Sequence, residues 1–272
     1  GGGGGITTTA AFTIDKNQIS VTLIPGQVKT ENITITNTGT NAATFTIENL
    51  IKDFVVRGEE IITLSPGESR VIPLYMLARV DTMPNLYLGK IIVSSGNVRK
   101  EILIAIEVES KGILLDVRAE ILEDYGRILP GRQILAEIRL FNLGGINDRK
   151  DVVIEYIIKD YDNNTIATET ESLAIQTQAT FIKRINIPEE TLIGPYVLYV
   201  MAIYDEKIAS SSDNFEVVPS IVSDREKIYI VIIIVLSVVI SSVIYYIVSK
   251  KGRGKSEKKS SGKVNLNKIM KK

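Results

Sequence analysis

A long uncharged run near the end of the chain constrains its folding more than any other feature. Residues Ile228–Val248 (IYIVIIIVLSVVISSVIYYIV) contain no charged side chain over 21 positions. A helix rising about 1.5 Å per residue would cover the roughly 30 Å hydrocarbon core of a bilayer. A buried core helix or strand is the alternative, but such elements are seldom this long and apolar throughout. The run therefore predicts a single transmembrane helix.

The charges on either side of this run predict its orientation. Asp224–Lys227 carry no net charge, whereas the C-terminal side begins with Lys250, Lys251, Arg253 and Lys255. By the positive-inside rule the tail is cytoplasmic and the head lies outside the cell membrane, in a single-pass arrangement. Residues 249–272 hold ten Lys and Arg against one acid. We expect this tail to contact anionic lipid headgroups, with nucleic acid as the less favoured partner.

The composition excludes most catalytic chemistry. The chain has no His, Cys or Trp, so it cannot build Ser-His-Asp or Cys-His relays, nor imidazole or thiolate metal centres. The adjacent carboxylates Glu59-Glu60 and Glu189-Glu190 fall in predicted turns, where neighbouring side chains point apart or into solvent. We therefore expect neither enzyme activity nor a cofactor.

An internal repeat divides the head into two similar parts. Pro25-Gly26 precedes Asn37-Thr38-Gly39, and Pro130-Gly131 precedes Asn142-Leu143-Gly144, with the same internal spacing and an offset of 105 residues. A period of this length is typical of one β-sandwich domain. Pro-Gly favours a turn that enters a strand, and Asn-x-Gly favours a turn that ends it.

Period-two alternation between these turns predicts strands, and no helical periodicity is sustained before the membrane segment. The predicted strands are Ile33–Ile35, Phe45–Ile47, Ile61–Leu64, Val71–Leu77, Lys90–Ser94, Ile102–Val108, Ile134–Leu140, Val152–Lys159, Ile166–Glu171, Phe181–Ile187 and Tyr196–Tyr204. The predicted fold is all-β: two tandem Ig-like antiparallel β-sandwiches, residues 10–110 and 111–219, followed by a linker (220–227), one transmembrane α-helix and the basic tail. Residues 1–9 form a glycine-rich start that we exclude from the fold.

Several segments resemble known prokaryotic Ig-like modules. The segments LSPGESRVIPL (Leu64–Leu74) and YLGKIIVSS (Tyr87–Ser95) resemble the alpha-galactosidase-associated (NPCBM-associated) domains, which also resemble the major-sperm-protein-like group. In the second half, GPYVLYV (Gly194–Val200) is similar to the cell-adhesion-related (CARDB-like) domains of bacteria and archaea. The resemblance implies a surface protein built from non-catalytic spacer or binding modules, and it specifies fold far better than function. The composition is compatible with an archaeal source.

One acidic segment carries part of a calcium-loop pattern. Asp160, Asp162, Asn164 and Glu171 fall at the spacing of calcium-loop ligands. Thr165, however, occupies the position that such loops reserve for glycine. A polar hairpin turn over Asp160–Thr165 is therefore the favoured interpretation, and we expect no metal.

Two further patterns concern modification and helix packing. Asn163 and Asn32 stand in N-glycosylation sequons, and Asn163, in the predicted turn, is the better acceptor. Asn32 lies within a predicted strand, which favours chance occurrence. Ser237 and Ser241 place small residues on one side of the membrane helix, where they favour contact with a partner helix or hydrogen bonds back to their own helix carbonyls.

Together these patterns predict a membrane-anchored binding or structural protein. Its two Ig-like domains would contact other cell-envelope proteins, or serve as an accessory subunit of a membrane complex, through exposed sheet edges and loops. The alternative is a carbohydrate-binding ectodomain of a glycan-processing system. The absence of Trp weakens this alternative, because sugar platforms usually need exposed aromatic faces.

Overall fold

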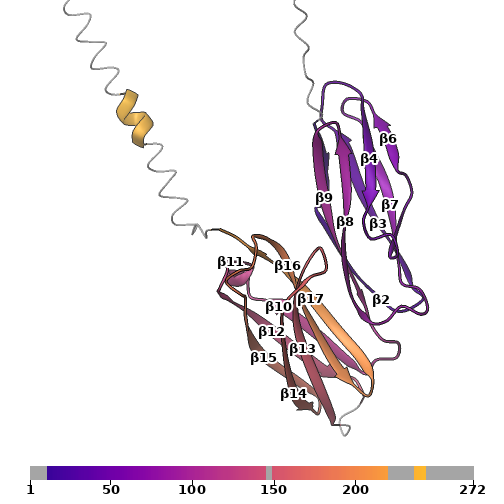
Figure 1. Cartoon of the computed structure of the whole chain (residues 1–272), viewed down its shortest axis with the longest axis vertical. Coiled ribbons are helices and arrows are strands. Elements are labelled where there is room, and N and C mark those ends of the chain that lie inside the picture. The colour runs from indigo at the N-terminus through magenta and orange to yellow at the C-terminus, as the bar shows by residue number, and fades with distance from the viewer. Residues whose placement is uncertain (1–10, 145–148, 220–235, 243–272) are drawn as a thin grey trace, which may run out of the picture. The chain divides into compact units, whose positions relative to one another are not determined.

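The computed structural model describes residues 11–144, 149–219 and 236–242 of the chain. The chain divides into two units, Gly1–Ser220 and Ile221–Lys272, and all the strands lie in the first. These strands form two β-sandwiches, called here domain 1 and domain 2 (Figure 1). The predicted boundary after residue 110 falls between the last strand of domain 1 and the first of domain 2.

Domain 1 pairs a four-stranded sheet with a five-stranded sheet. In spatial order the first contains β1 (Phe12–Ile14), β3 (Val28–Asn37), β7 (Ser69–Leu77) and β5 (Val55–Arg57). The second contains β2 (Gln18–Leu23), β9 (Val98–Val108), β8 (Asn85–Ser95), β4 (Ala43–Asn49) and β6 (Ile61–Leu64).

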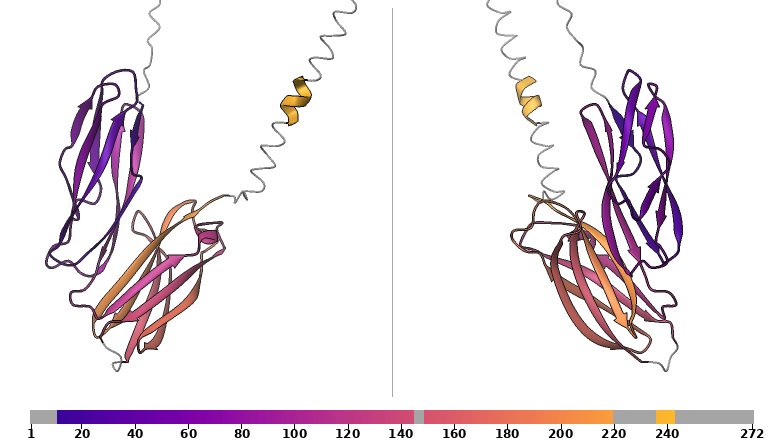
Figure 2. Two further views of the ribbon diagram at one scale, coloured as in Figure 1. Left: turned by 180° about the vertical axis from the view of Figure 1, so that it is seen from behind. Right: turned by 45° about the vertical axis from the view of Figure 1, so that its right-hand side comes forward.

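Domain 2 repeats this plan with three and five strands. The smaller sheet contains β10 (Leu115–Ile121), β12 (Gln133–Asn142) and β15 (Gln178–Asn186). The larger contains β11 (Arg127–Ile128), β17 (Lys207–Val217), β16 (Gly194–Tyr204), β13 (Lys150–Asp160) and β14 (Thr165–Ile175), and one 3-10 helix, η1 (Glu123–Tyr125), precedes β11. Figure 2 shows the layers of each sandwich from further directions.

The two domains match residue by residue in their smaller sheets. Thr30 of β3 lies opposite Tyr75 of β7, and the residue 105 positions later, Leu135, lies opposite Arg184. Inward residues alternate with outward ones along these strands, as Ile33 and Ile35 (both 0% exposed) do with their neighbours. This alternation fills one apolar core in each sandwich. The predicted repeat is therefore a structural repeat.

The sequence predicts antiparallel sandwiches, but two of the observed strand pairs are parallel. β2 pairs with β9, and β11 with β17, in parallel. In both domains the chain first pairs with one sheet, through β1 or β10, and then crosses to the edge of the other. The crossing strand then runs beside the last strand of its domain. Its direction is set by this change of sheet, which local alternation does not encode.

The alternation pattern also missed whole strands. No strand was predicted at β1, β2, β5, β10, β11 or β17. β17 contains the run Ser210-Ser211-Ser212-Asp213-Asn214, whose composition is typical of a turn. Its strand conformation is a tertiary effect, because pairing with β16 over its whole length satisfies the backbone.

The predicted membrane helix lies mostly outside the described residues. A helical segment covers residues 236–242 (Figure 1, yellow). Within the described part of the chain, no helix is long and apolar enough to cross a membrane. In this segment Ser241 Oγ donates to the carbonyl of Ser237 at 2.7 Å, the second of the two arrangements expected for these serines. The four basic residues Lys250, Lys251, Arg253 and Lys255 lie outside the described residues.

Candidate functional site

The outer faces of β8 and β9 pack against those of β16 and β17, and we call this contact the seam. Its apolar part consists of Leu86, Leu88 and Ala105 from domain 1 with Tyr161, Val197 and Tyr199 from domain 2. β16 is consequently buried on both faces, since Leu198 and Val200 point into the core of domain 2. Burial of these apolar side chains stabilises the contact between the two sandwiches, which belong to one compact unit.

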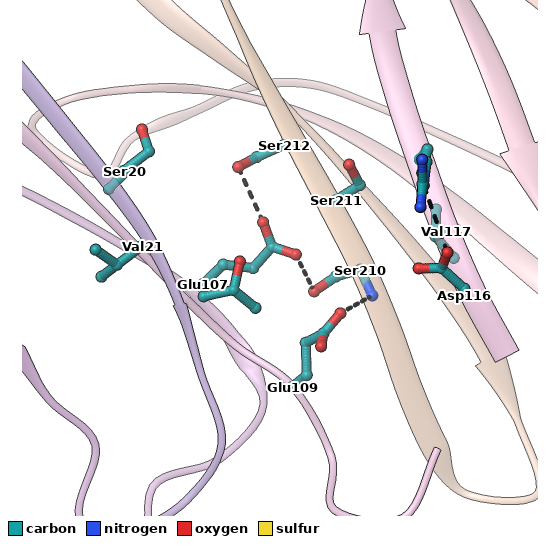
Figure 3. Close-up of a pocket in the computed structure, with 12 residues that line it drawn as sticks. Ser20, Val21, Glu107, Glu109, Asp116, Val117, Ser210, Ser211 and Ser212 are labelled. Atoms are coloured by element: carbon teal, nitrogen blue, oxygen red, sulfur yellow. Dashed lines mark hydrogen bonds and ion pairs between the residues drawn. The ribbon is translucent and has the colours of Figure 1, made fainter. Parts of the chain in front are cut away.

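A buried carboxylate occupies the polar part of the seam. Glu107 of β9 is 6% exposed and accepts two hydrogen bonds, from Ser210 Oγ at 2.7 Å and from Ser212 Oγ at 3.0 Å. Glu109 accepts a bond from the backbone N–H of Ser210 at 3.2 Å. Figure 3 shows the Glu107 carboxylate pointing at the serines of β17. A cavity of about 390 Å³ adjoins this cluster.

The surroundings of Glu107 favour its protonated form. Its hydrogen-bond partners are neutral hydroxyls, so the charge of an ionised carboxylate would be poorly compensated. Burial raises the pKa of Glu107 to about 7; the two serine bonds oppose this rise, and the nearby Glu109 adds to it. Burial also raises the pKa of Glu109. We therefore expect the strength of this contact to fall as pH rises through the pKa of Glu107.

The polar residues Ser210–Asp213 of β17 form hydrogen bonds on both sides of the strand. Ser210 and Ser212 face domain 1, whereas Ser211 and Asp213 face β10 of their own domain. Ser211 Oγ accepts the backbone N–H of Ala119 at 3.1 Å, and Asp213 Oδ2 accepts that of Ile121 at 2.7 Å. These bonds cover the free edge of β10, which would otherwise offer its N–H groups to another chain.

The edges at β14 and β15 are bridged by charged side chains. Lys183 of β15 is 16% exposed and lies 3.1 Å from Glu169 and 3.3 Å from Glu171 of β14. Its ammonium also stands 4.6 Å from the ring centroid of Tyr156, whose hydroxyl donates to Glu171 at 2.6 Å. Inward-pointing charge of this kind is a common protection against strand addition.

The four calcium-loop residues do not converge on one point. Asp160 accepts bonds from the backbone N–H groups of Asp162 and Asn164 at 3.0 and 2.8 Å, which closes the hairpin turn between β13 and β14. Asp162 pairs with Lys90 of domain 1 at 2.8 Å. Glu171 lies within β14, opposite Ile154 and away from this turn. No group of three or more metal-ligating side chains occurs within the described residues.

The two sequons occupy different surroundings. Asn163 is exposed in the β13–β14 turn and has a positive φ of 68°. Asn32 is exposed on the outer face of β3, opposite Pro73 of β7. Both side chains are thus open to solvent, one at a turn and one on a sheet face.

The outer face of the β1-β3-β7-β5 sheet carries no charge on its outward residues. Along β7 these residues are Ser69, Val71, Pro73, Tyr75 and Leu77, flanked by threonines and Asn32 of β3 and by Val56 of β5. Val71 is 56% exposed, Val56 50% and Tyr75 41%, and Val56 lies directly opposite Tyr75. We call this surface the uncharged face. Exposed apolar side chains gathered in this way mark interaction surfaces.

Sequence reasoning missed both the seam and the uncharged face. A signal for the seam was present, because GPYVLYVMAIY in β16 and EILIAIEV in β9 are nearly continuous apolar runs. Such runs indicate strands buried on both faces, whereas simple alternation indicates one buried face. The predicted sites rested on short motifs, and none of them includes Glu107.

Comparison with known proteins finds only remote structural similarity. No family model and no curated protein matches this chain. The chain is similar to a solved protein of unknown function from Porphyromonas gingivalis W83, with 10% identity and a TM-score of 0.42 over 76% of this chain and 99% of that one. It is also similar to PapD-like domain 7 of human CEP192 (11% identity, TM-score 0.33, 36% and 85% covered) and to the YadV chaperone (12%, 0.29, 76% and 99%). Similarity this low carries no functional argument.

Proposed function

We propose that this chain is a membrane-anchored, non-enzymatic binding protein of the cell envelope, whose two Ig-like sandwiches act as one rigid body. Three properties support this proposal: the apolar run at Ile228–Val248, the buried seam, and the uncharged face. The head would lie outside the cell and the basic tail in the cytoplasm.

The uncharged face is the observation that carries the binding role. The equivalent face of domain 2, on β10-β12-β15, bears Asp116, Arg118, Glu120, Glu137, Arg139 and Arg184. Several of these pair with one another, as Arg139 does with Glu137 at 2.7 Å. A sheet face covered by paired charges is well solvated and needs no protein partner. Because the two faces share one register, the sandwich fold does not require domain 1 to leave its face uncharged.

The uncharged face is also better suited to contact a partner protein than the edges of the sheets are. The strands β1 and β5, which border the uncharged face, have three residues each. The longer edges of domain 2 are covered by β17 side chains or bridged by Lys183. We therefore place the protein partner on the uncharged face instead of on an added strand.

Co-purification from gently solubilised membranes tests this proposal. The full chain should recover a partner protein, and Val71→Glu should reduce that recovery about tenfold, as burying an unpaired charge in an interface does. Thr180→Glu is the matched control, because Thr180 occupies the position in β15 that Val71 occupies in β7. Equal recovery by both variants would contradict a role for the uncharged face.

The location of the head is tested separately. Protease added outside intact cells should digest the two sandwiches and leave the last 24 residues protected. A glycan on Asn32 would cover the uncharged face, so the proposal also expects Asn32 to be unmodified in the bound protein. Mass spectrometry of the purified chain measures this directly.

A carbohydrate-binding ectodomain is the second candidate. One observation favours this candidate: carboxylates and hydroxyls line the seam cavity, among them Glu109, Asp116 and Ser20. Such groups can hydrogen-bond a sugar. None of its lining residues is aromatic, so the cavity offers no stacking platform for a sugar ring. Binding of the chain to a glycan array, unaffected by Val71→Glu, would favour this candidate over the first.

A further inference from the structure

The loop between β15 and β16 exposes two large aliphatic side chains at its tip. Leu192 is 78% exposed and its neighbour Ile193 is 59% exposed. The hydroxyl of Tyr196 donates to the carbonyl of Leu192 at 2.8 Å, and the N–H of Thr191 donates to the carbonyl of Pro188 at 3.2 Å. These bonds hold the tip in place, so the exposure of Leu192 is built into the loop.

This tip lies beside the point where the chain leaves domain 2. Gly194, the residue after Ile193, pairs with Val217 at the end of β17. Val218 makes the next bond, from its N–H to the carbonyl of Ile128 at 2.8 Å. Only residues 219–227 separate Val218 from the start of the uncharged run at Ile228. Even with these residues fully extended, Val218 and Ile228 lie no more than about 36 Å apart.

We propose that Leu192 and Ile193 form a lipid-contacting tip that inserts into the outer surface of the membrane in which the chain is anchored. This inference rests on the anchorage proposed above. An apolar group at such a surface settles at the boundary between headgroups and acyl chains. Glu189 and Glu190 precede the tip, so its contact with lipid is apolar and does not depend on anionic headgroups.

Domain 1 supplies an internal control. Met83 is 77% exposed in the equivalent loop, and its carbonyl accepts the hydroxyl of Tyr87 at 2.8 Å, as that of Leu192 does from Tyr196. The strand that ends beside this loop is β9, whose Val108 pairs with Asn85. β9 leads into domain 2 and not into the apolar run. Met83 therefore shares the exposure and the local geometry of Leu192 without its position in the chain.

Site-directed spin labelling tests the tip, because this chain has no cysteine that would compete for the label. Leu192→Cys and Met83→Cys each provide a single labelling site, and Ile193→Cys provides a second one at the tip. Each full-length variant carries a nitroxide and is reconstituted into phosphatidylcholine vesicles. The ratio of oxygen to nickel-chelate accessibility should be several-fold higher at positions 192 and 193 than at position 83. Far-ultraviolet circular dichroism checks that each variant is folded.

Two outcomes overturn the inference. Equal, water-like accessibility ratios at 192 and 83 would show that the tip does not meet lipid. Low accessibility to both reagents at 192 would show that protein covers it instead. Vesicle flotation after an alkaline carbonate wash separates this failure from failure of the anchor. If the chain floats with the vesicles but the label at 192 is in water, only the proposal for the tip is wrong. If the chain does not float, both the tip and the membrane anchor are wrong.

Discussion

The two sandwiches have the same inner faces and opposite outer ones. Positions 105 residues apart in β3 and β12 meet partners 109 residues apart in β7 and β15. The fully buried residues of these four strands are apolar in both domains, among them Ile33 and Ile72 in domain 1 and Ile138 and Ile185 in domain 2. Outward, the smaller sheet of domain 1 presents threonine, valine, proline and tyrosine without charge, whereas that of domain 2 presents paired charges together with the exposed Ile182. The core restricts the inward residues, and surroundings outside the sandwich restrict the outward ones.

This difference teaches where to look for function in a repeated fold. Each domain buries part of the outer face of its larger sheet in the seam, at β8–β9 in domain 1 and at β16–β17 in domain 2. The outer face of its smaller sheet is open. The charged open face is explained by solubility alone. The uncharged one is not, and for this reason we propose that the binding role belongs to domain 1.

The largest expected effect tests the shared core. Ile35 and Leu140 are fully buried at equivalent positions. Replacing either by alanine should cost about 2–5 kcal/mol of unfolding free energy through lost burial and a residual cavity. Urea denaturation followed by circular dichroism measures the loss. If one substitution costs far less than the other, the two cores are not packed alike.

The next effect concerns the seam and has a defined pH window. The pKa of Glu107 rises from 4.5 to about 7 in the folded chain. A carboxyl whose folded pKa is raised contributes stability that is fully present below pH 4.5 and is lost as pH rises through 7. The loss amounts to about 3 kcal/mol at about 1.4 kcal/mol per pKa unit.

Glu107→Gln should remove this loss, because the amide is never ionised and can still bond both serines. The variant should therefore unfold at a higher temperature than the natural chain at pH 8, with the difference shrinking toward pH 4.5. Thermal unfolding across this range measures it, with the exposed Glu120→Gln as control. A difference that does not vary with pH would show that Glu107 is not the titrating group.

A smaller effect separates the two Asn-x-Gly turns. Asn37 is 1% exposed and donates to the carbonyls of Asn41 and Leu64, both at 2.9 Å. Asn142 donates to the carbonyl of Gln176 at 2.9 Å from a more exposed position. Asn37→Ala should cost about 2–3 kcal/mol and Asn142→Ala about 1 kcal/mol, since water replaces a lost partner only where it has access. Equal costs in urea denaturation would contradict this assignment of burial.

The smallest effect is expected at the exposed ion pair of the seam. Asp162 has a side chain that is 69% exposed, and Lys90 one that is 20% exposed. Asp162→Asn should change the unfolding free energy by less than about 1 kcal/mol, because solvent and salt screen such a pair. A larger loss, measured in the same denaturation experiment, would contradict the view that solvent screens this pair.

The sequence supported the fold well and the site poorly. The hairpin turn at Asp160–Thr165 and the two Pro-Gly entries follow from local chemistry, and the structure contains them. Glu107 could not be singled out in this way. In EILIAIEV, Glu107 is an acidic residue at an outward strand position, and such residues are most often exposed to solvent. Its burial depends on a serine run about a hundred residues later that itself carries no strand signal.

What the sequence determined by itself is the periodic and local part of this protein: inward positions, turns, the repeat, and a 21-residue apolar run that predicts a membrane anchor. Only the tertiary structure decided which outward faces meet, which strand runs parallel, and which aliphatic residues stay exposed. The physical reason is the distance along the chain over which each interaction acts. Alternation and turn preferences act between residues close in the chain, whereas the environment of an outward side chain is set by whatever remote surface packs against it.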